Sequence, residues 1–236
     1  LNEKMTARII GIGAYAPEQV VTNQDLTKFL DTNDAWIRER TGIGARHVST
    51  SEGTSALATE AAKRAIADAG ISPEEIEIVI VATSSPDRAF PSAAADVQGA
   101  IGAKHAVAFD ITAACSGFIY ALHIVQGFIQ AGIYKTALII GAETLSKVLD
   151  WTDRSSCILF GDGAGAAVVV KTLVGSDGTK NDVLYCQARS LENCLTGGKP
   201  ELGFMQMDGQ EVFKFAVKKV PEIVNAILEE TGTDRE

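Results

Sequence analysis

Apolar residues along much of the chain gather in short runs that are separated by longer segments with helical spacing. The runs predict strands over residues 8–13, 76–82, 106–111, 136–141 and 164–171. Residues 54–69 carry apolar side chains at helical intervals, and Gly70 follows as a helix end. Short apolar strands that alternate with helices are typical of an α/β fold around a mostly parallel sheet with both faces covered.

Capping residues indicate where the other helices begin and end. Residues 22–25 predict a helix start with an acid in its first turn, and a short helix over 34–40 stops at Thr41 and Gly42. Ser92 begins a helix that runs to about residue 101. Further predicted elements are a helix over 115–131 closed by Gly132, a turn-rich linker over 175–180, a strand over 182–189, a loop over 192–203 and a helix over 210–230.

Composition narrows the class of protein. The chain has 236 residues, 46% of them hydrophobic, which is enough to bury a sizeable core. Its net charge of −9 disfavours nucleic-acid binding. No apolar stretch predicts a membrane span, and residues 1–8 do not predict a signal peptide. The cysteines and histidines lack metal-site or disulfide-framework spacing, so we expect no metal and a reducing, cytoplasmic location; they are Cys115, Cys157, Cys186, Cys194, His47, His105 and His123.

Cys115 stands where a predicted strand passes through small residues into a helix. A sulfur at a helix N-terminus meets unpaired N–H groups and the positive end of the helix dipole, which favour the thiolate. A thiolate there can take an acyl group from a thioester, and its own N–H can help to hold the oxyanion. A buried structural cysteine fits the spacing equally well.

Two other patterns carry candidate chemistry. Trp36 and Arg40 are four residues apart, so they share a helix face where an indole plane and a guanidinium can hold a purine and a phosphate. A surface arginine beside a half-buried tryptophan is the alternative. The glycine-rich stretch 160–165 lacks the Lys-Ser/Thr of a phosphate loop and runs into a strand, so we expect its glycines to let the backbone pass close to the Cys115 turn.

Four stretches, taken together, resemble the β-ketoacyl-acyl-carrier-protein synthase III family, the enzymes that start bacterial fatty-acid synthesis. They are residues 34–43, 106–118, 160–166 and 207–216, in the family's order and spacing. The resemblance implies a homodimer and an α/β thiolase-like fold, in which two similar halves pack into one body. Residues 1–172 would form the complete N-terminal half with the nucleophile, and 173–236 a linker and an incomplete start of the C-terminal half.

The resemblance also implies a reaction. An acyl-coenzyme A primer such as acetyl-coenzyme A is joined to malonyl-acyl-carrier protein through an acyl-Cys115 thioester, with loss of CO₂, giving 3-oxoacyl-acyl-carrier protein. Coenzyme A is part of the substrate, and no cofactor is expected. The residues that match substrate or coenzyme A positions are Thr32, Trp36, Arg40, Arg154, Phe160, Gly209, Phe213 and Ala216. Phe90 matches a residue that reaches the partner subunit's acyl tunnel, and Lys214 and Lys218 are expected to dock the carrier protein.

The family's catalytic His and Asn match no residue of this sequence. His47, His105 and His123 fall at other places, so we expect the 236-residue chain to be inactive in condensation by itself. A truncated protein, an incomplete record of a longer one and a working fragment each fit this absence.

Three alternatives to a synthase III stay open. A non-catalytic module that binds coenzyme A or the carrier protein is the main one, and a plain α/β domain with an inert cysteine is another. Related condensing enzymes, such as a hydroxymethylglutaryl-coenzyme A synthase or a polyketide-type synthase, form the third. The sequence does not predict the length or branching of the primer.

Overall fold

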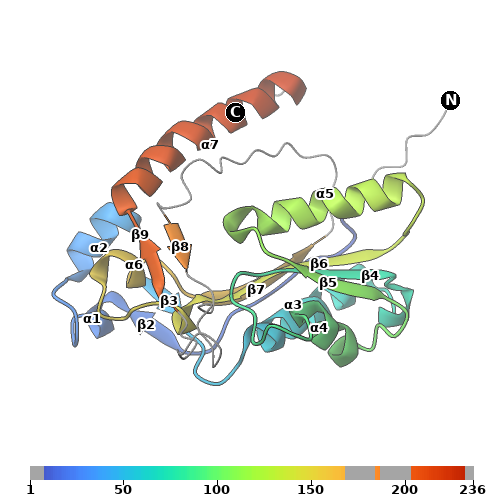
Figure 1. Ribbon diagram of the computed structural model, residues 1–236, viewed down its shortest axis with the longest axis horizontal. Helices are drawn as coiled ribbons and strands as arrows, with labels where there is room; N and C mark the ends of the chain where they lie inside the picture. The colour runs from blue at the N-terminus through green and yellow to red at the C-terminus, as the bar shows by residue number, and fades with distance from the viewer. Residues whose placement is uncertain (1–7, 168–183, 187–202, 232–236) are drawn as a thin grey trace, which may run out of the picture.

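The computed structural model describes residues 8–167, 184–186 and 203–231 (Figure 1). The predicted linker, the boundary between residues 172 and 173, and Cys194 lie outside these residues, as do parts of the strands predicted over 164–171 and 182–189.

A five-stranded sheet forms the centre of the molecule. Its order is β1 (Gly13–Tyr15), β7 (Asp162–Ala167), β6 (Ala137–Thr144), β4 (Ile78–Ala82) and β5 (Val107–Ile111). β4 pairs in parallel with β5 and β6, whereas β7 runs antiparallel to β6 and to β1. β1, β6, β4 and β5 therefore run in the same direction, which confirms the prediction of a mostly parallel sheet, and β7 is the reversed strand among the five. The chain returns from β6 through the short helices η3 (Leu145–Lys147) and α6 (Arg154–Cys157), without the long crossover that a parallel strand needs.

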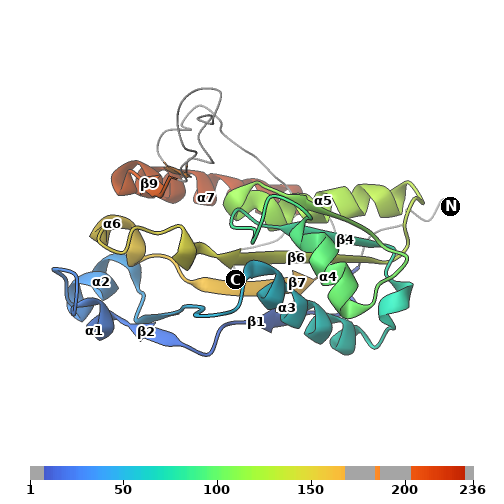
Figure 2. The ribbon, with the colours of Figure 1, turned by 60° about the horizontal axis from the view of Figure 1, so that its bottom comes forward.

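Helices cover the two faces of the sheet unequally (Figures 1 and 2). α3 (Thr54–Ala69) and α4 (Ala93–Ile101) pack on one face, and α5 (Gly117–Gln130) packs on β4 and β6 from the other. Successive residues of a strand point to opposite faces, so Val79 and Val81 join the α3–α4 core, while Ile78 and Ile80 join the α5 core. All five residues of β4 are buried, which makes this strand the middle of both cores.

A smaller unit extends from one end of the sheet. The antiparallel pair β2 (Val20–Thr22) and β3 (Ala45–His47) packs with α1 (Asn23–Leu26), α2 (Asp34–Thr41) and α6 around a separate apolar cluster. Buried Arg46 joins these parts because its guanidinium donates to the Val21 and Ile158 carbonyls and to Asn23 Oδ1. β8 (Leu184–Cys186) and β9 (Met205–Met207) lie beside this unit in Figure 1, and the long helix α7 (Gly209–Thr231) starts next to it and extends away. The sequence did not predict β2, β3, α6 or β9.

Predicted helix ends agree well with the structure. Thr22 and Ser92 cap α1 and α4 through their side chains, and α3 has the predicted bounds. The predicted strand over residues 8–13 is wrong, because the strand begins only at Gly13 and Ile9, Ile10 and Ile12 are exposed. β1 is an edge strand that pairs with β7 as its one described neighbour. The apolar residues that lead into it are therefore not covered by strands on both sides.

None of the helices in the described part of the chain is long and apolar enough to cross a membrane.

Gly13 lies so close to α3 that a side chain has no room. A Cβ there would stand 2.3 Å from the Ala61 carbonyl oxygen and 2.4 Å from the Ala65 nitrogen, both of them backbone atoms. We expect Gly13→Ala to lower the free energy of unfolding by about 1–3 kcal/mol, measured by urea denaturation. Gly99→Ala is the matched control, since a Cβ there meets nothing within 4 Å and favours the helix; equal stabilities of the two variants would contradict this packing.

Candidate active site

Cys115 lies on a sharp turn between β5 and α5. The turn residues Ala114–Ser116 form one 3₁₀ turn, and α5 begins directly behind it at Gly117. Ala114 has a φ of 44°, in the left-handed region that residues other than glycine rarely adopt. This conformation turns the chain away from the sheet and leaves the Cys115 side chain exposed. The sequence prediction of a small-residue turn with Cys115 at the helix N-terminus is confirmed.

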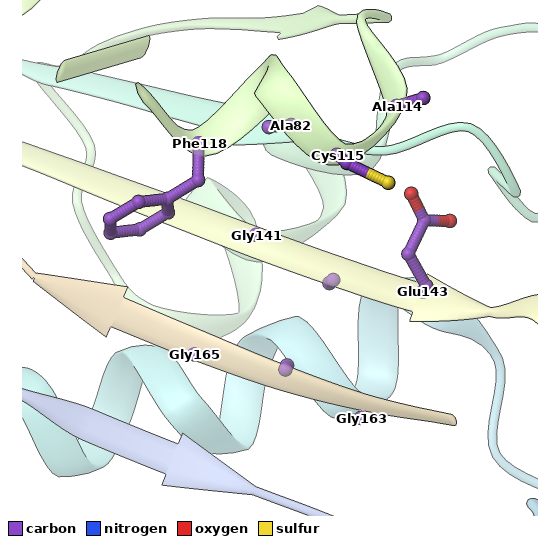
Figure 3. A pocket seen from close by; sticks show the side chains of 10 residues that line it. Ala82, Ala114, Cys115, Phe118, Gly141, Glu143, Gly163 and Gly165 are labelled. Atoms are coloured by element: carbon purple, nitrogen blue, oxygen red, sulfur yellow. The ribbon is translucent and has the colours of Figure 1, made fainter. Parts of the chain in front are cut away.

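A pocket of about 240 Å³ opens beside Cys115 (Figure 3). Its walls come from the Cys115 turn, from the carboxyl ends of β4 and β6, and from β7. Seven of its ten lining residues are glycine or alanine, and they are Ala82, Ala114, Gly141, Ala142, Gly163, Ala164 and Gly165. Gly163 and Gly165 of the 160–165 stretch line this pocket together with Cys115, but the predicted close approach to the Cys115 turn is not seen, because a Cβ at Gly165 would meet nothing within 4 Å and one at Gly163 only the Tyr15 carbonyl.

Glu143 is the feature of this pocket that the sequence analysis missed. Figure 3 shows its carboxylate and the Cys115 sulfur pointing toward each other. Glu143 Oε1 accepts from the Ser84 backbone N–H at 2.8 Å, and Oε2 accepts from the hydroxyls of Thr83 and Ser85. The only sequence signal was an acidic residue near the end of a buried strand.

The loop after β4 connects Glu143 to the Cys115 turn. The Thr83 N–H donates to the Ile111 carbonyl at 3.1 Å, and the Thr112 hydroxyl donates to the Thr83 carbonyl at 3.2 Å. Buried Ser85 also accepts from the Thr144 N–H at 2.9 Å. The exits of β4, β5 and β6 are thereby held together beside the pocket.

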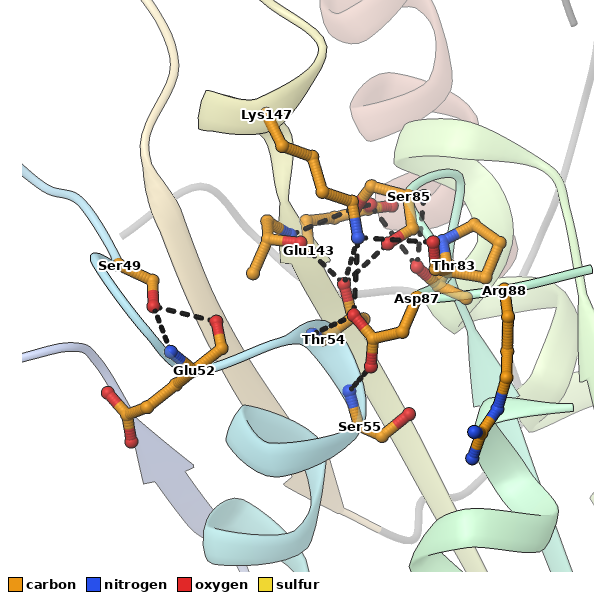
Figure 4. Close-up of polar contacts among 12 residues, drawn as sticks. Ser49, Glu52, Thr54, Ser55, Thr83, Ser85, Asp87, Arg88, Glu143 and Lys147 are labelled. Atoms are coloured by element: carbon orange, nitrogen blue, oxygen red, sulfur yellow. Dashed lines mark hydrogen bonds and ion pairs between the residues drawn. The ribbon is translucent and has the colours of Figure 1, made fainter.

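A second polar cluster fixes the other side of this loop (Figure 4). Asp87 accepts from the Thr54 and Ser55 N–H groups at the start of α3, both at 2.8 Å. Lys147 Nζ lies 3.3 Å from Asp87 Oδ1. These bonds and the Lys147 charge hold the pKa of Asp87 below its usual value, although its partial burial acts in the opposite direction.

The histidines of the chain lie away from this pocket. His47 Nδ1 is 2.6 Å from the Pro17 carbonyl, His105 is exposed, and His123 Nδ1 is 3.3 Å from the Ile119 carbonyl within α5. None of the three lines the Cys115 pocket. Within the described residues, no group of three or more His, Cys, Asp or Glu side chains could hold a metal ion.

A larger groove collects most residues that the sequence analysis assigned to coenzyme A. It has a volume of about 1360 Å³ and lies between α2, α6, β8, β9 and the start of α7. Five predicted residues line it, and they are Trp36, Arg40, Arg154, Gly209 and Phe213. The guanidinium carbons of Arg40 and Arg154 lie 4.4 and 4.6 Å from the centre of the Trp36 ring. One aromatic plane and two cations are thus brought together from two separate helices.

Three other predicted substrate residues do not line either cavity. Phe160 packs against the apolar cluster beneath α2 and is not among the residues that line the Cys115 pocket. Thr32 is half-buried, and its hydroxyl is without a hydrogen-bond partner among the described residues. Ala216 is exposed on α7. Their assigned roles stay predictions.

The residues expected to meet other proteins are exposed. Phe90 is 83% exposed in the loop before α4. Lys214 and Lys218 lie on α7, where Lys214 Nζ is 2.6 Å from Glu211 Oε1 and lines the groove. These positions leave the predicted contacts with a partner subunit and a carrier protein untested.

Comparison with known proteins gives a consistent set of relatives. Residues 109–189 match the family model for 3-oxoacyl-[acyl-carrier-protein (ACP)] synthase III. The chain is 49% identical to a β-ketoacyl-[acyl-carrier-protein] synthase III of Clostridium acetobutylicum, over 98% of this chain and 74% of that relative.

Solved structures agree with these relatives. A 3-oxoacyl-[acyl-carrier-protein] synthase III from Aquifex aeolicus is 44% identical with a TM-score of 0.80, over 97% of this chain and 73% of that one. The corresponding enzyme from Pseudomonas aeruginosa is 38% identical with a TM-score of 0.87, over the same 97% and 73%. The predicted thiolase-like α/β fold is therefore confirmed.

Cys115 and Cys157 are expected to differ in their reactivity toward alkylating reagents, because one thiol is exposed and the other is buried. Cys157 is fully buried in α6, and burial raises its pKa to about 11, so little thiolate exists near neutral pH. We expect iodoacetamide at about pH 8 to alkylate exposed Cys115 and to spare Cys157 until the protein is unfolded. Peptide mapping by mass spectrometry measures both, and alkylation of native Cys157 at the rate of Cys115 would contradict the burial.

Proposed function

Because this chain belongs to the β-ketoacyl-[acyl-carrier-protein] synthase III family, we propose that Cys115 is the residue on which it carries the acyl primer. The family's enzymes are condensing acyltransferases that initiate fatty-acid synthesis. The observation that carries the proposal is the exposed sulfur of Cys115 on a strained turn at the mouth of a pocket. The relatives' names support an acyl-carrier-protein thioester as the second substrate.

The groove around Trp36 supports coenzyme A as the carrier of the primer. A flat ring can stack on a purine, and the guanidinium groups of Arg40 and Arg154 can pair with phosphates. Gly209 and Phe213 line the same groove, where the pantetheine arm would run toward the pocket. We propose Thr32, Phe160 and Ala216 as neighbours of this path, on the family resemblance alone.

The proposed loading step transfers an acyl group from coenzyme A to Cys115. The Cys115 sulfur attacks the thioester carbonyl carbon, the carbon–sulfur bond to coenzyme A breaks, and coenzyme A leaves as the thiol with the proton of Cys115. The N–H of Cys115 itself would help to stabilise the oxyanion that forms on the carbonyl, because the Ser116 and Gly117 N–H groups already donate to the Ala113 and Ala114 carbonyls. The loaded acyl group would occupy the pocket against Ala82, Phe118 and Gly141.

We further propose that the 236 residues by themselves load Cys115 but do not condense. Decarboxylating a malonyl thioester requires groups that stabilise the developing enolate, and the family uses a His and an Asn for this. The positions of His47, His105 and His123 outside the pocket support this restriction. We also propose that residues 1–172 form the complete N-terminal half and 173–236 the start of the C-terminal half, and that the chain forms a homodimer in which Phe90 reaches the partner subunit's acyl tunnel.

The same histidine positions favour a second candidate function. A fragment that binds coenzyme A or the carrier protein without chemistry would need the groove and not the reactivity of Cys115. Binding of acetyl-coenzyme A that saturates without acylating Cys115 distinguishes this candidate from the first.

The loading step can be tested directly on the purified chain. We expect acetyl-coenzyme A to acetylate Cys115 stoichiometrically, as seen by intact mass and peptide mapping, and Cys115→Ser to abolish the adduct. Cys186→Ser is the matched control, since Cys186 is exposed but lies on β8 and does not line the pocket. Added malonyl-carrier protein is expected to give no ketoacyl product; turnover like that of the whole enzymes would refute the restriction, and an unmodified Cys115 would refute the loading.

The nucleotide groove generates a separate prediction. Stacking of a base on an aromatic ring contributes about 1–3 kcal/mol, so Trp36→Ala should raise the acetyl-coenzyme A concentration that gives half the maximal loading rate by about 10-fold or more. Acetyl-pantetheine lacks the nucleotide, and its loading rate should not change. An equal effect on both thioesters would mean that Trp36 acts through the fold and not through the nucleotide.

A further inference from the structure

Glu143 is the one acidic side chain among the ten residues that line the Cys115 pocket. The remaining nine lining residues are alanine, glycine, phenylalanine and Cys115 itself. Glu143 lies near the carboxyl end of β6, and its carboxylate points toward the Cys115 sulfur (Figure 3). An acyl group on Cys115 would therefore share a small space with this carboxylate.

The hydrogen bonds of Glu143 match an ionised carboxylate. An ionised carboxylate accepts but does not donate, and its contacts are the Ser84 N–H and the hydroxyls of Thr83 and Ser85. The Ser85 hydroxyl in turn accepts from the Thr144 N–H, which directs its own proton to Glu143. These bonds also fix the carboxylate in place, so it cannot swing away from the pocket.

No cation among the described residues pairs with Glu143. The nearby ammonium of Lys147 lies 3.3 Å from Asp87 Oδ1 and from the Thr54 hydroxyl, and 3.1 Å from the Pro86 carbonyl (Figure 4). The negative charge of Glu143 therefore acts on the pocket without an ion-pair partner, screened by its hydrogen bonds and by solvent at the opening.

We propose that Glu143 selects the acyl group that Cys115 accepts, by disfavouring acyl groups that carry a free carboxylate. Such a group would place its negative charge beside Glu143 and lose part of its hydration, and like charges a few ångströms apart repel. A neutral acyl group would meet only alanine, glycine and Phe118. This inference rests on the proposed loading step, in which an acetyl thioester must react with Cys115 while a malonyl thioester is also present.

The charge can be removed without changing the size of the side chain. For Glu143→Gln we expect the ratio of Cys115 acylation rates, malonyl-coenzyme A over acetyl-coenzyme A, to rise by about 10-fold over the unsubstituted protein. Rates come from time courses of intact mass with each thioester alone, and acetyl adducts formed from malonyl-coenzyme A by loss of CO₂ count as malonyl loading. A ratio that stays within about 2-fold would overturn the proposal.

The ratio of malonyl to acetyl acylation rates distinguishes a charge effect from a general disordering of the loop that follows β4. If Glu143→Gln loosened the bonds to Thr83 and Ser85, both acylation rates would fall together and the ratio would stay constant. Glu143→Asp keeps the charge and should keep the ratio low, so a ratio as high as that of Glu143→Gln would show that shape decides. Glu74→Gln removes the same charge from an exposed position at the opposite end of β4 and should change nothing.

A pair of small reagents tests the charge without any coenzyme A thioester. Iodoacetate and iodoacetamide alkylate Cys115 through the same reaction and differ in the carboxylate. Glu143→Gln should raise the iodoacetate-to-iodoacetamide rate ratio, and an unchanged ratio would overturn the proposal. Failure of acetyl-coenzyme A to modify the unsubstituted protein would instead refute the loading step, and the reagent pair then decides alone whether Glu143 repels anions at Cys115.

Discussion

The chain must leave β5 and start α5 within a few residues, and the rest of the site depends on how this turn is held. Ala114 adopts a left-handed conformation there, which costs about 1–3 kcal/mol for a residue with a side chain. Two bonds between the Thr83 loop and the end of β5 keep the turn against the sheet. The completely buried strand β4 supplies the rigid base for that loop, so the core of the sheet supports the strained conformation.

The Cys115 pocket and the groove around Trp36 lie in different parts of the molecule and differ in size and charge. The pocket at the strand ends is small and made mostly of backbone and methyl groups, whereas the groove around Trp36 is wide and carries cations. The groove is assembled by the smaller unit, whose position depends on Arg46 binding three acceptors from three segments. A change in the groove can therefore alter how a carrier is held and leave the geometry of the Cys115 turn intact.

Much of the fold could be predicted from the sequence, because local signals determine it. The caps Thr22 and Ser92, the glycine after α3 and the apolar run of β4 each act within a few residues. The exposure of Ile9, Ile10 and Ile12 and the reversed direction of β7 depend on which strands become neighbours, which no local pattern encodes. The role of Cys115 was ambiguous by spacing and became specific through four ordered motifs. Glu143 escaped notice because its importance lies in contacts with residues about 60 positions away in the sequence.

The glycine and alanine lining of the Cys115 pocket also limits how this site can evolve. Where a wall is already backbone or a single methyl group, a point substitution can take volume away but has almost nothing left to remove. Phe118 is the one bulky neutral side chain among the lining residues, and it also packs in the α5 core, so trimming it would cost stability. Point substitutions can therefore readily make this pocket narrower, whereas a wider pocket requires the strands or α5 to move apart.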